Sequence, residues 1–240
     1  MKGYCHMKVT AIIPAAGKGK RMLHSLPKHF IRIEDKPVLA YTLDIFEKCP
    51  DVNQILIVSR SGEEDYCLKE VVEKYGYKKV LKIVIGGDRR QDSVYNGIKA
   101  LDEDTDIVVV HDGVRPFVSQ NTLREAIKLA MFADGAVTAV PVKDTIKDVG
   151  NDGIIRSTPD RSTLWYAQTP QVFKRRILEE AYLRAYNDKF TGTDESSLVE
   201  RLGYNVKILE GTPDNIKITT KEDLLFADMI LMIQKKKSTK

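Results

Sequence analysis

Residues 9–22 read Val-Thr-Ala-Ile-Ile-Pro-Ala-Ala-Gly-Lys-Gly-Lys-Arg-Met, an apolar run that leads directly into a loop of small and basic residues. The run 9–14 predicts a buried strand. In the loop, glycine and alanine let backbone N–H groups approach an oxyanion, and Arg21 and Lys28 can add positive charge. The spacing matches neither a P-loop nor a dinucleotide fingerprint, since Met22 stands where the third glycine would be. The stretch therefore predicts a phosphate-binding loop, and the alternative is a glycine-rich turn that binds nothing.

Strand-like runs and amphipathic segments alternate along most of the chain. The runs lie at 9–14, 54–58, 82–85, 107–111 and 136–140. The segments 41–48, 64–75, 91–101 and 122–133 place apolar residues at intervals of three and four, as helices that cover a sheet do. This alternation predicts an α/β fold with a doubly wound, mostly parallel sheet. Such sheets bind ligands at the carboxyl ends of their strands.

The alternation lapses over residues 142–166. Segments 143–147 and 154–157 flank the turn Gly150-Asn151-Asp152-Gly153, which predicts a protruding β-hairpin arm. Because an isolated hairpin is marginally stable in water, we expect a second copy of the chain to cover it. The remainder predicts helices at 175–187 and 194–202 and strands at 206–209 and 215–218. A last helix is expected from Thr219 to about residue 233, with Glu222 completing a capping box.

The composition fits one domain over residues 1–240 that carries the arm at about 142–166. Its 240 residues are 42% hydrophobic and 30% charged, with a formal net charge of +4. Basic and acidic residues alternate outside the terminal lysines 235–237, so we expect no nucleic-acid partner. No apolar run approaches the roughly 20 residues that cross a bilayer, so we expect no membrane span. Three cysteines without metal-ligand spacing, and no signal-peptide pattern, indicate the cytoplasm.

Two further loops follow predicted strands. Residues 86–93, Gly-Gly-Asp-Arg-Arg-Gln-Asp-Ser, combine a turn that admits a flat base with polar groups, although Asp92 or Ser93 could simply cap the next helix. Residues 111–116, His-Asp-Gly-Val-Arg-Pro, follow the most apolar strand. Asp112 could anchor a metal ion or hydroxyl, or could form a structural ion pair with Arg115. His111 is expected to pack or hydrogen-bond, because no second ligand lies at a metal-binding interval.

Ordered motifs extend over residues 9–233, among them Pro14-Ala15-Ala16-Gly17, Gly86-Gly87-Asp88, Lys143-Asp144-Thr145, Leu164-Trp165 and Thr193-Asp194-Glu195. Together they resemble the 2-C-methyl-D-erythritol 4-phosphate cytidylyltransferase family. The resemblance implies a Rossmann-like nucleotidyltransferase fold. It also implies that methylerythritol phosphate attacks the α-phosphorus of CTP with Mg²⁺ present, which yields a CDP-alcohol and pyrophosphate in the non-mevalonate isoprenoid pathway. An attacking phosphate is already anionic, so this reaction needs orientation and charge neutralisation rather than a general base.

The resemblance also implies three groups of site residues, carried over by matching position. The catalytic group would be Arg21, Lys28, Arg161 and Lys217. The nucleotide would be held by Ala15, Ala16, Gly17, Lys28, Gly87, Asp88 and Ser93. The acceptor would be bound by Asp112, Gly113, Arg115, Thr145, Arg161, Thr169 and Lys217, with Thr145 and Arg161 supplied by the partner's arm in a homodimer. The CTP phosphates would hold most of the Mg²⁺ coordination, with Asp112 as a protein ligand.

Two adjacent positions depart from the family pattern, since Gly113-Val114 stands where the family commonly has Ala-Ala. The related ribitol 5-phosphate cytidylyltransferases often carry a small residue followed by Val there, which makes CDP-ribitol synthesis the alternative. A noncatalytic nucleotide-binding module on the same fold is a further alternative. Retention of Arg21, Lys28, Arg161 and Lys217 together favours an enzyme. The 86–93 loop favours the methylerythritol acceptor.

Overall fold

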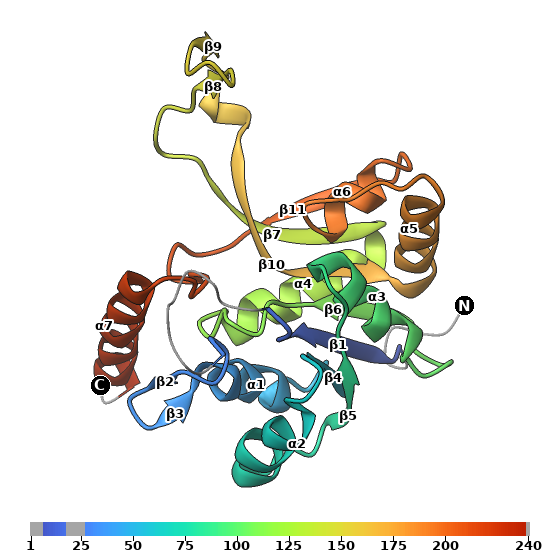
Figure 1. The fold of residues 1–240 in the computed structure, drawn as a ribbon, viewed down its shortest axis with the longest axis vertical. Helices are drawn as coiled ribbons and strands as arrows, with labels where there is room; N and C mark the ends of the chain where they lie inside the picture. Colours follow the sequence, from blue (N-terminus) through green and yellow to red (C-terminus); the bar gives the residue numbers. More distant parts are fainter. Residues whose placement is uncertain (1–6, 18–26, 239–240) are drawn as a thin grey trace.

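A seven-stranded sheet forms the centre of the computed structural model, which describes residues 7–17 and 27–238 (Figure 1). Its strands, in spatial order, are β11 (Val206–Glu210), β7 (Gly135–Pro141), β10 (Trp165–Lys174), β6 (Ile107–Val110), β1 (Val9–Pro14), β4 (Gln54–Ser59) and β5 (Val80–Ile85). Neighbouring strands are parallel except that β10 runs antiparallel to both β6 and β7. The predicted mostly parallel α/β sheet is confirmed.

Strand β10 has no counterpart among the strands expected from the sequence. Its pairing register with β7 shifts between Ala167 and Gln171, where Gln168, Thr169 and Pro170 intervene. Polar residues and a proline inside a central strand disrupt the apolar pattern by which a strand is recognised. Tertiary contacts compensate for them here: the Gln171 amide donates to Asp194 Oδ2 at 2.7 Å, for example.

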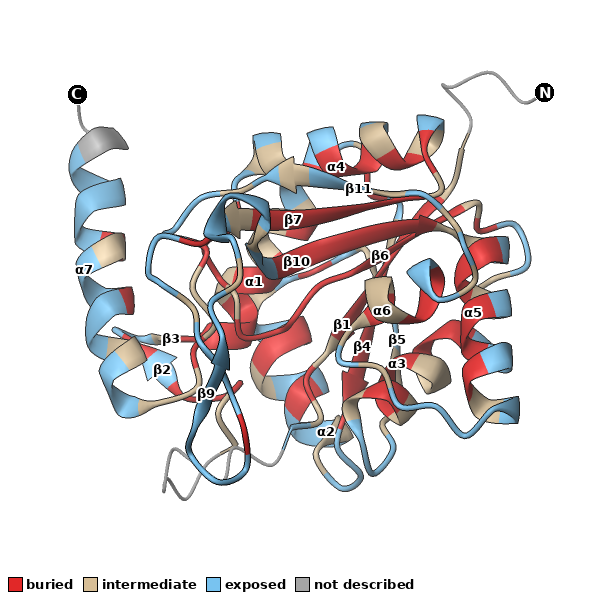
Figure 2. Ribbon diagram, turned by 90° about the horizontal axis from the view of Figure 1, so that it is seen from above, coloured by how far each residue is buried: buried red, intermediate tan, exposed pale blue. Residues whose placement is uncertain are grey.

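Helices cover both faces of the sheet. They are α1 (Val38–Lys48), α2 (Glu64–Cys67) with its π-helical continuation Leu68–Glu73, α3 (Arg90–Lys99), α4 (Gln120–Phe132), α5 (Arg175–Asn187) and α6 (Glu195–Glu200). Alternate side chains of β1 enter different cores: Ala11 and Ile13 pack on the side of α1 and α4, and Ile12 packs on the side of α3 and α5. Figure 2 shows the buried strands between helices whose outer faces are exposed. The doubly wound arrangement is therefore confirmed.

The chain leaves the sheet after β7 and returns to it at Trp165, the start of β10, and the residues between, 142–164, project from the body as an arm (Figure 1). At its far end β8 (Asp148–Val149) pairs antiparallel with β9 (Ile155–Ser157). The hairpin prediction is confirmed, although the first strand lies at 148–149 instead of 143–147. Val149, Ile154 and Ile155 are exposed. The arm of a single chain thus has no apolar core of its own, and the expected dimer stays a prediction.

The C-terminal segment differs from expectation in its strand, in the cap of its last helix and in the length of that helix, which ends at Ser238 instead of about residue 233. Residues 215–218 form no strand. Helix α7 (Lys221–Ser238) begins with a capping box of Thr220 and Asp223, in place of Thr219 and Glu222. The Asp223 N–H donates to Thr220 Oγ1 at 3.3 Å, and the Thr220 N–H donates to Asp223 Oδ2 at 2.8 Å. Asp223 also accepts the Thr219 N–H at 2.7 Å. Because two threonines and two acidic residues stand side by side here, the capping-box spacing fits either pair, and the sequence does not distinguish them.

The inner face of α7 packs on a small hairpin formed by β2 (Arg32–Ile33) and β3 (Lys36–Pro37). Ala227 and Leu231 share this core with Val114 and Ile218, which lie beside the loops at the strand ends. The last helix therefore supports the segment that carries Lys217. Among the helices in the described part of the chain, none is long and apolar enough to cross a membrane.

Candidate active site

A cavity of about 500 Å³ opens at the carboxyl ends of β1, β4, β5 and β6. This is where parallel α/β sheets bind ligands. The predicted site residues that line it are Ala15, Ala16, Gly17, Lys28, Gly87, Asp88, Ser93, Asp112 and Lys217. The lining residues that were not predicted include His29, Arg60, Ser61, Arg89, Arg90 and Val114. The loop after β4 could have been found by the rule that selected the other loops, because it also follows a predicted strand. Arg21 lies outside the described residues.

Glycines bring the loop after β5 close to the loop after β1. A Cβ added to Gly86 would lie 2.7 Å from the Ala16 Cβ, and one added to Gly87 would overlap Asp92. The Ser93 hydroxyl holds this turn by accepting the Gly87 N–H at 3.1 Å. Asp92 caps α3 by accepting the Arg89 N–H at 3.1 Å. Asp92 therefore caps the helix, and the adjacent Ser93 lies on the cavity wall, so this loop does more than cap the helix.

Lys28 reaches the loop after β1 from a separate segment. A Cβ added to Gly17 would lie 3.4 Å from the Lys28 Cε and 3.7 Å from its Nζ, so the ammonium group lies near the backbone of that loop. The next residue, His29, is buried and accepts the Leu39 N–H at 3.0 Å through its carbonyl, which fixes this segment to the start of α1. Lys28 therefore places a cation beside the loop that was predicted to bind phosphate.

Three cations surround the buried carboxylate of Asp112, just after β6. On Oδ2, Lys217 Nζ lies at 2.9 Å and Arg115 Nε at 3.3 Å. On Oδ1, Arg90 Nε lies at 3.3 Å. Burial opposes ionisation, but the three cations outweigh it and hold the pKa of Asp112 well below its usual range. The predicted ion pair with Arg115 is confirmed, and it is one of three around a carboxylate that stays charged at neutral pH.

His111 and Thr169 hold the backbone of this loop. The His111 Nε2 lies 3.0 Å from the Arg115 carbonyl, which can only accept, so Nε2 carries the proton. Nδ1 therefore accepts from the Thr169 hydroxyl at 3.1 Å, and that hydroxyl accepts the Asp112 N–H at 3.0 Å. Burial lowers the pKa of His111 to about 4, so the ring is neutral at pH 7. As expected, His111 hydrogen-bonds, and both of its nitrogens are occupied.

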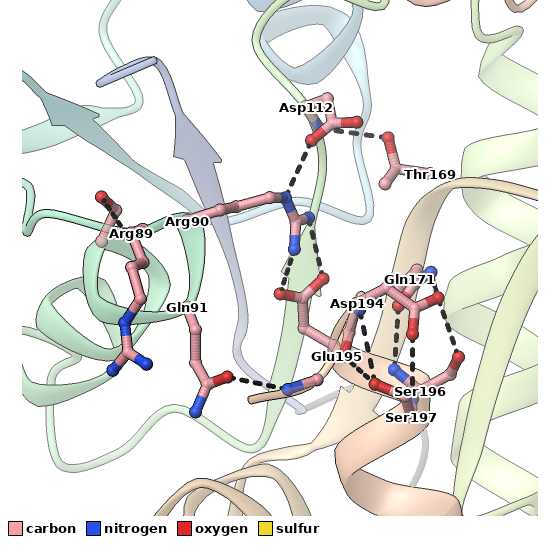
Figure 3. Close-up of polar contacts among 12 residues, drawn as sticks. Arg89, Arg90, Gln91, Asp112, Thr169, Gln171, Asp194, Glu195, Ser196 and Ser197 are labelled. Atoms are coloured by element: carbon pink, nitrogen blue, oxygen red, sulfur yellow. Dashed lines mark hydrogen bonds and ion pairs between the residues drawn. The ribbon is translucent and has the colours of Figure 1, made fainter. Parts of the chain in front are cut away.

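Arg90 joins the Asp112 loop to helix α6 (Figure 3). Its Nη1 and Nη2 lie 2.7 Å and 2.9 Å from Oε1 and Oε2 of Glu195, which is almost fully buried. The Tyr182 hydroxyl donates to Glu195 Oε1 at 3.1 Å. Burial lowers the pKa of Arg90, but the Glu195 and Asp112 carboxylates raise it more, so the net shift is upward. No pattern in the sequence indicates this pair, because its members are 105 positions apart.

The other predicted residues lie outside the cavity wall of this chain. Arg115 donates from Nη1 to the Asn215 carbonyl at 2.7 Å. Gly113 donates its N–H to the Pro14 carbonyl at 3.2 Å, and a Cβ added there would lie 3.1 Å from Leu39 Cδ1. At position 113 the departure from the family's alanine therefore faces the core, where it bears on packing, whereas Val114 at the second position lines the cavity. Thr145 and Arg161 are exposed on the arm, away from the cavity.

The donor set around the cavity does not form a metal cage built from protein alone. Within residues 7–17 and 27–238, no group of three or more His, Cys, Asp or Glu side chains could hold a metal ion. Asp88 and Asp112 are the carboxylates among the described lining residues. Mg²⁺ commonly takes one or two carboxylates and completes its coordination with substrate phosphates and water. The residues present fit a metal ion that enters with a phosphate ligand.

Known proteins resemble this chain over nearly its full length. The family model described as 2-C-methyl-D-erythritol 4-phosphate cytidylyltransferase matches residues 9–233. A curated relative of that name from Alkaliphilus metalliredigens is 48% identical over 224 residues, which are 93% of this chain and 93% of the relative. Another of that name, from Clostridioides difficile, is 43% identical over 227 residues, which are 95% of each chain.

Solved structures agree with the sequence relatives. The 4-diphosphocytidyl-2C-methyl-D-erythritol synthase of Anaerococcus prevotii superposes with a TM-score of 0.84 at 35% identity, covering 94% of this chain and 96% of that one. The 2-C-methyl-D-erythritol 4-phosphate cytidylyltransferase of Thermus thermophilus gives a TM-score of 0.75 at 30% identity, covering 93% and 98%. The chain therefore belongs to the 2-C-methyl-D-erythritol 4-phosphate cytidylyltransferase family and is a nucleotidyltransferase, as its motifs predicted.

Proposed function

We propose that the chain transfers the cytidylyl group of CTP to 2-C-methyl-D-erythritol 4-phosphate, with release of pyrophosphate, as a step of the non-mevalonate isoprenoid pathway. The observation that carries this is the cavity itself, where the backbone loops after β1 and β5 lie beside Lys28 and Lys217. An oxygen of the acceptor phosphate forms a bond to the α-phosphorus. The bond from that phosphorus to the oxygen bridging it to the β-phosphorus breaks, and pyrophosphate leaves.

Each side of the cavity suits one substrate. On the β1 and β5 side, the nucleotide would contact Ala15, Ala16, Gly17, Gly87, Asp88 and Ser93. The small residues leave backbone N–H groups accessible, and Lys28, together with Arg21, would offset charge on the reacting phosphates. On the β6 side, Asp112, Gly113, Arg115, Thr169 and Lys217 would orient the acceptor, with Gly113 and Thr169 acting through the backbone of the loop.

The arrangement of His111 agrees with a reaction that needs no general base. The attacking phosphate oxygen carries a charge and no proton that must be removed. His111 is neutral, buried and hydrogen-bonded at both nitrogens, so it holds the loop in place instead of exchanging protons with a substrate. Rate enhancement then comes from orientation of two anions and from fixed positive charge around them.

Mg²⁺ is the cofactor that this reaction requires. It would enter with the CTP phosphates, and Asp112, or Asp88 on the nucleotide side, would supply a carboxylate oxygen. When bound, it would neutralise charge on the phosphates that react and leave. Arg90, Lys217 and Arg115 together hold the pKa of Asp112 well below its usual range, so the carboxylate is ionised and able to bind a cation.

A homodimer would complete the site with Thr145 and Arg161 from the partner's arm. Within one chain, the Arg161 guanidinium donates to the Lys143 carbonyl at 2.8 Å and so stays on the arm. The exposed apolar side chains at the arm's end support burial against another chain. Cys49 and Cys67 are free buried thiols, which supports a reducing compartment such as the cytoplasm.

The test is turnover of two purified acceptors. Protein, CTP and Mg²⁺ are incubated with methylerythritol phosphate or ribitol 5-phosphate, and both pyrophosphate and the CDP-alcohol are measured. We expect release with methylerythritol phosphate and little with ribitol 5-phosphate. A preference for ribitol 5-phosphate would overturn the acceptor assignment. CTP binding without pyrophosphate from either acceptor would indicate a noncatalytic module.

A further inference from the structure

We propose that Glu195 is a positioning residue for the acceptor side of the cavity, and that it acts through Arg90 on Asp112. The inference rests on the proposed transfer reaction and adds a residue to it. Glu195 belongs to the motif Thr193-Asp194-Glu195, which has no part in the reaction described so far. Its side chain is buried, and it does not line the cavity. Any influence on the substrates must therefore pass through a neighbouring side chain.

The geometry of Arg90 provides that connection (Figure 3). A guanidinium group is planar, with two terminal nitrogens along one edge and Nε–H on another. Glu195 occupies both terminal nitrogens, at 2.7 Å and 2.9 Å. This bidentate contact fixes the plane of the group, so its Nε–H points to Asp112 Oδ1 at 3.3 Å. Arg90 is therefore fixed in an orientation that positions the Asp112 carboxylate. Its guanidinium group is not free to turn toward a phosphate.

Glu195 is itself fixed from two directions. The Tyr182 hydroxyl on α5 donates to Oε1 at 3.1 Å. The start of α6 is tied to β10, since the Gln171 amide donates to Asp194 Oδ2 at 2.7 Å and the Ser196 N–H donates to Gln171 Oε1 at 3.1 Å. Strand β10 also carries the hydroxyl that accepts the Asp112 N–H. The carboxylate of Asp112 and its backbone are thus positioned by the same strand and helix.

This arrangement makes an asymmetric prediction for the two substrates. Asp112 lies with Lys217 and Arg115 on the acceptor side. The Gly86-Gly87 turn on the nucleotide side is held by a contact of its own, the Gly87 N–H on Ser93 Oγ at 3.1 Å, in which neither Arg90 nor Glu195 takes part. Loss of the Glu195 charge should therefore disturb acceptor binding and leave CTP binding nearly unchanged. A general loss of structure would weaken both.

The experiment compares Glu195→Gln with Glu179→Gln. The control removes the carboxylate from another arginine–glutamate pair, in which Arg175 Nε lies 2.7 Å from Glu179 Oε1, away from the cavity. For Glu195→Gln we expect the KM of methylerythritol phosphate to rise about 10-fold while the KM of CTP changes less than about 2-fold. The control should leave both within about 2-fold. Equal rises in both KM values, or no rise for the acceptor, would overturn the inference.

A double-mutant cycle tests whether the effect passes through Asp112. In an Asp112→Asn background, adding Glu195→Gln should lower kcat/KM for the acceptor by less than about 2-fold, because the group it positions is already altered. A full 10-fold further loss would overturn the route through Asp112.

If Glu195→Gln does not fold, Tyr182→Phe replaces it: a selective rise in acceptor KM supports the inference, and an unchanged acceptor KM opposes it. Absence of turnover in the wild-type protein would instead count against the proposed function.

Discussion

Replacing Thr169 by valine should destabilise the protein by about 3 kcal/mol, although the side chain keeps its shape. The Thr169 hydroxyl is buried between two partners: it accepts the Asp112 N–H at 3.0 Å and donates to His111 Nδ1 at 3.1 Å. Valine offers neither bond, and both bonds are buried, so the Asp112 N–H and the His111 Nδ1 are poorly placed to find a replacement partner. Two polar groups therefore lose their partner through one substitution.

The magnitude follows from those two groups. A buried polar group left without a hydrogen bond costs about 1–3 kcal/mol, and there are two of them. Burying a methyl group in place of a hydroxyl stabilises the folded state by up to about 1 kcal/mol, which offsets part of this cost. The net loss is then about 3 kcal/mol, which lowers the urea midpoint by roughly 1 M for a slope of about 3 kcal/mol per M. Acceptor turnover should fall as well, because the Asp112 backbone loses its anchor.

The assay is equilibrium urea unfolding with Thr138→Val as the matched control. Thr138 is fully buried on the neighbouring strand β7, and its hydroxyl has no hydrogen-bond partner within the described part of the chain. The control removes a buried hydroxyl without breaking a bond, so we expect its unfolding free energy to change by less than about 0.5 kcal/mol or to rise. Equal midpoints for the two variants would refute the assignment of the Thr169 bonds.

Three further outcomes follow from the same structure. Lys28→Ala should lower kcat/KM by about 10²- to 10³-fold in a pyrophosphate-release assay, and near-normal turnover would remove it from catalysis. An equal mixture of Arg161→Ala and Lys28→Ala chains should regain about a quarter of wild-type activity if arms are exchanged, because about half of the dimers are mixed and one of the two sites in each is intact. No recovery would oppose the exchange. Hydrogen bonds from Arg89, opposed by burial and reinforced by Tyr186, lower the pKa of Asp92 to about 2. Its stabilisation is therefore complete above about pH 4 and is lost as the pH falls toward 2, so Asp92→Asn should cost about 2 kcal/mol at pH 7 and less at pH 3 in urea titrations; an equal cost at both pH values would contradict this.

The central parallel strands could be predicted because each is buried on both faces. Strand β6 (Ile107–Val110) is fully apolar, and such a run is visible in the sequence without knowledge of its neighbours. Strand β10 is equally central, yet Gln168, Thr169 and Gln171 are buried in it. Those side chains are tolerated because residues from distant segments complete their hydrogen bonds. A local sequence pattern does not show which distant residues will do so. The same limit explains why residues 215–218, apolar in part, form no strand.

The site was predictable where loop position alone determines function. Residues after β1, β5 and β6 could be selected because parallel strands bring their carboxyl ends to one edge. The contacts that orient those residues could not, because they depend on side chains that meet only in the folded chain. The Arg90–Glu195 pair and the approach of Lys217 to Asp112 both join segments about a hundred residues apart. The motif at 193–195 could be recognised in the sequence, but its contact with Arg90 could not be predicted from it.

The charges around Asp112 explain why a buried acid lies in a cavity that would bind two anions. Arg90, Arg115 and Lys217 surround it, and without a carboxylate these cations would repel one another and turn outward. Asp112 binds Lys217 and Arg115 through Oδ2. Glu195 neutralises Arg90 through the two terminal nitrogens of its guanidinium group. Three positive and two negative side chains leave one surplus positive charge, and two of the cations, Arg90 and Lys217, line the cavity. Because the cations lower the pKa of Asp112 so far, the carboxylate stays ionised throughout the neutral range, and this surplus depends on geometry instead of pH.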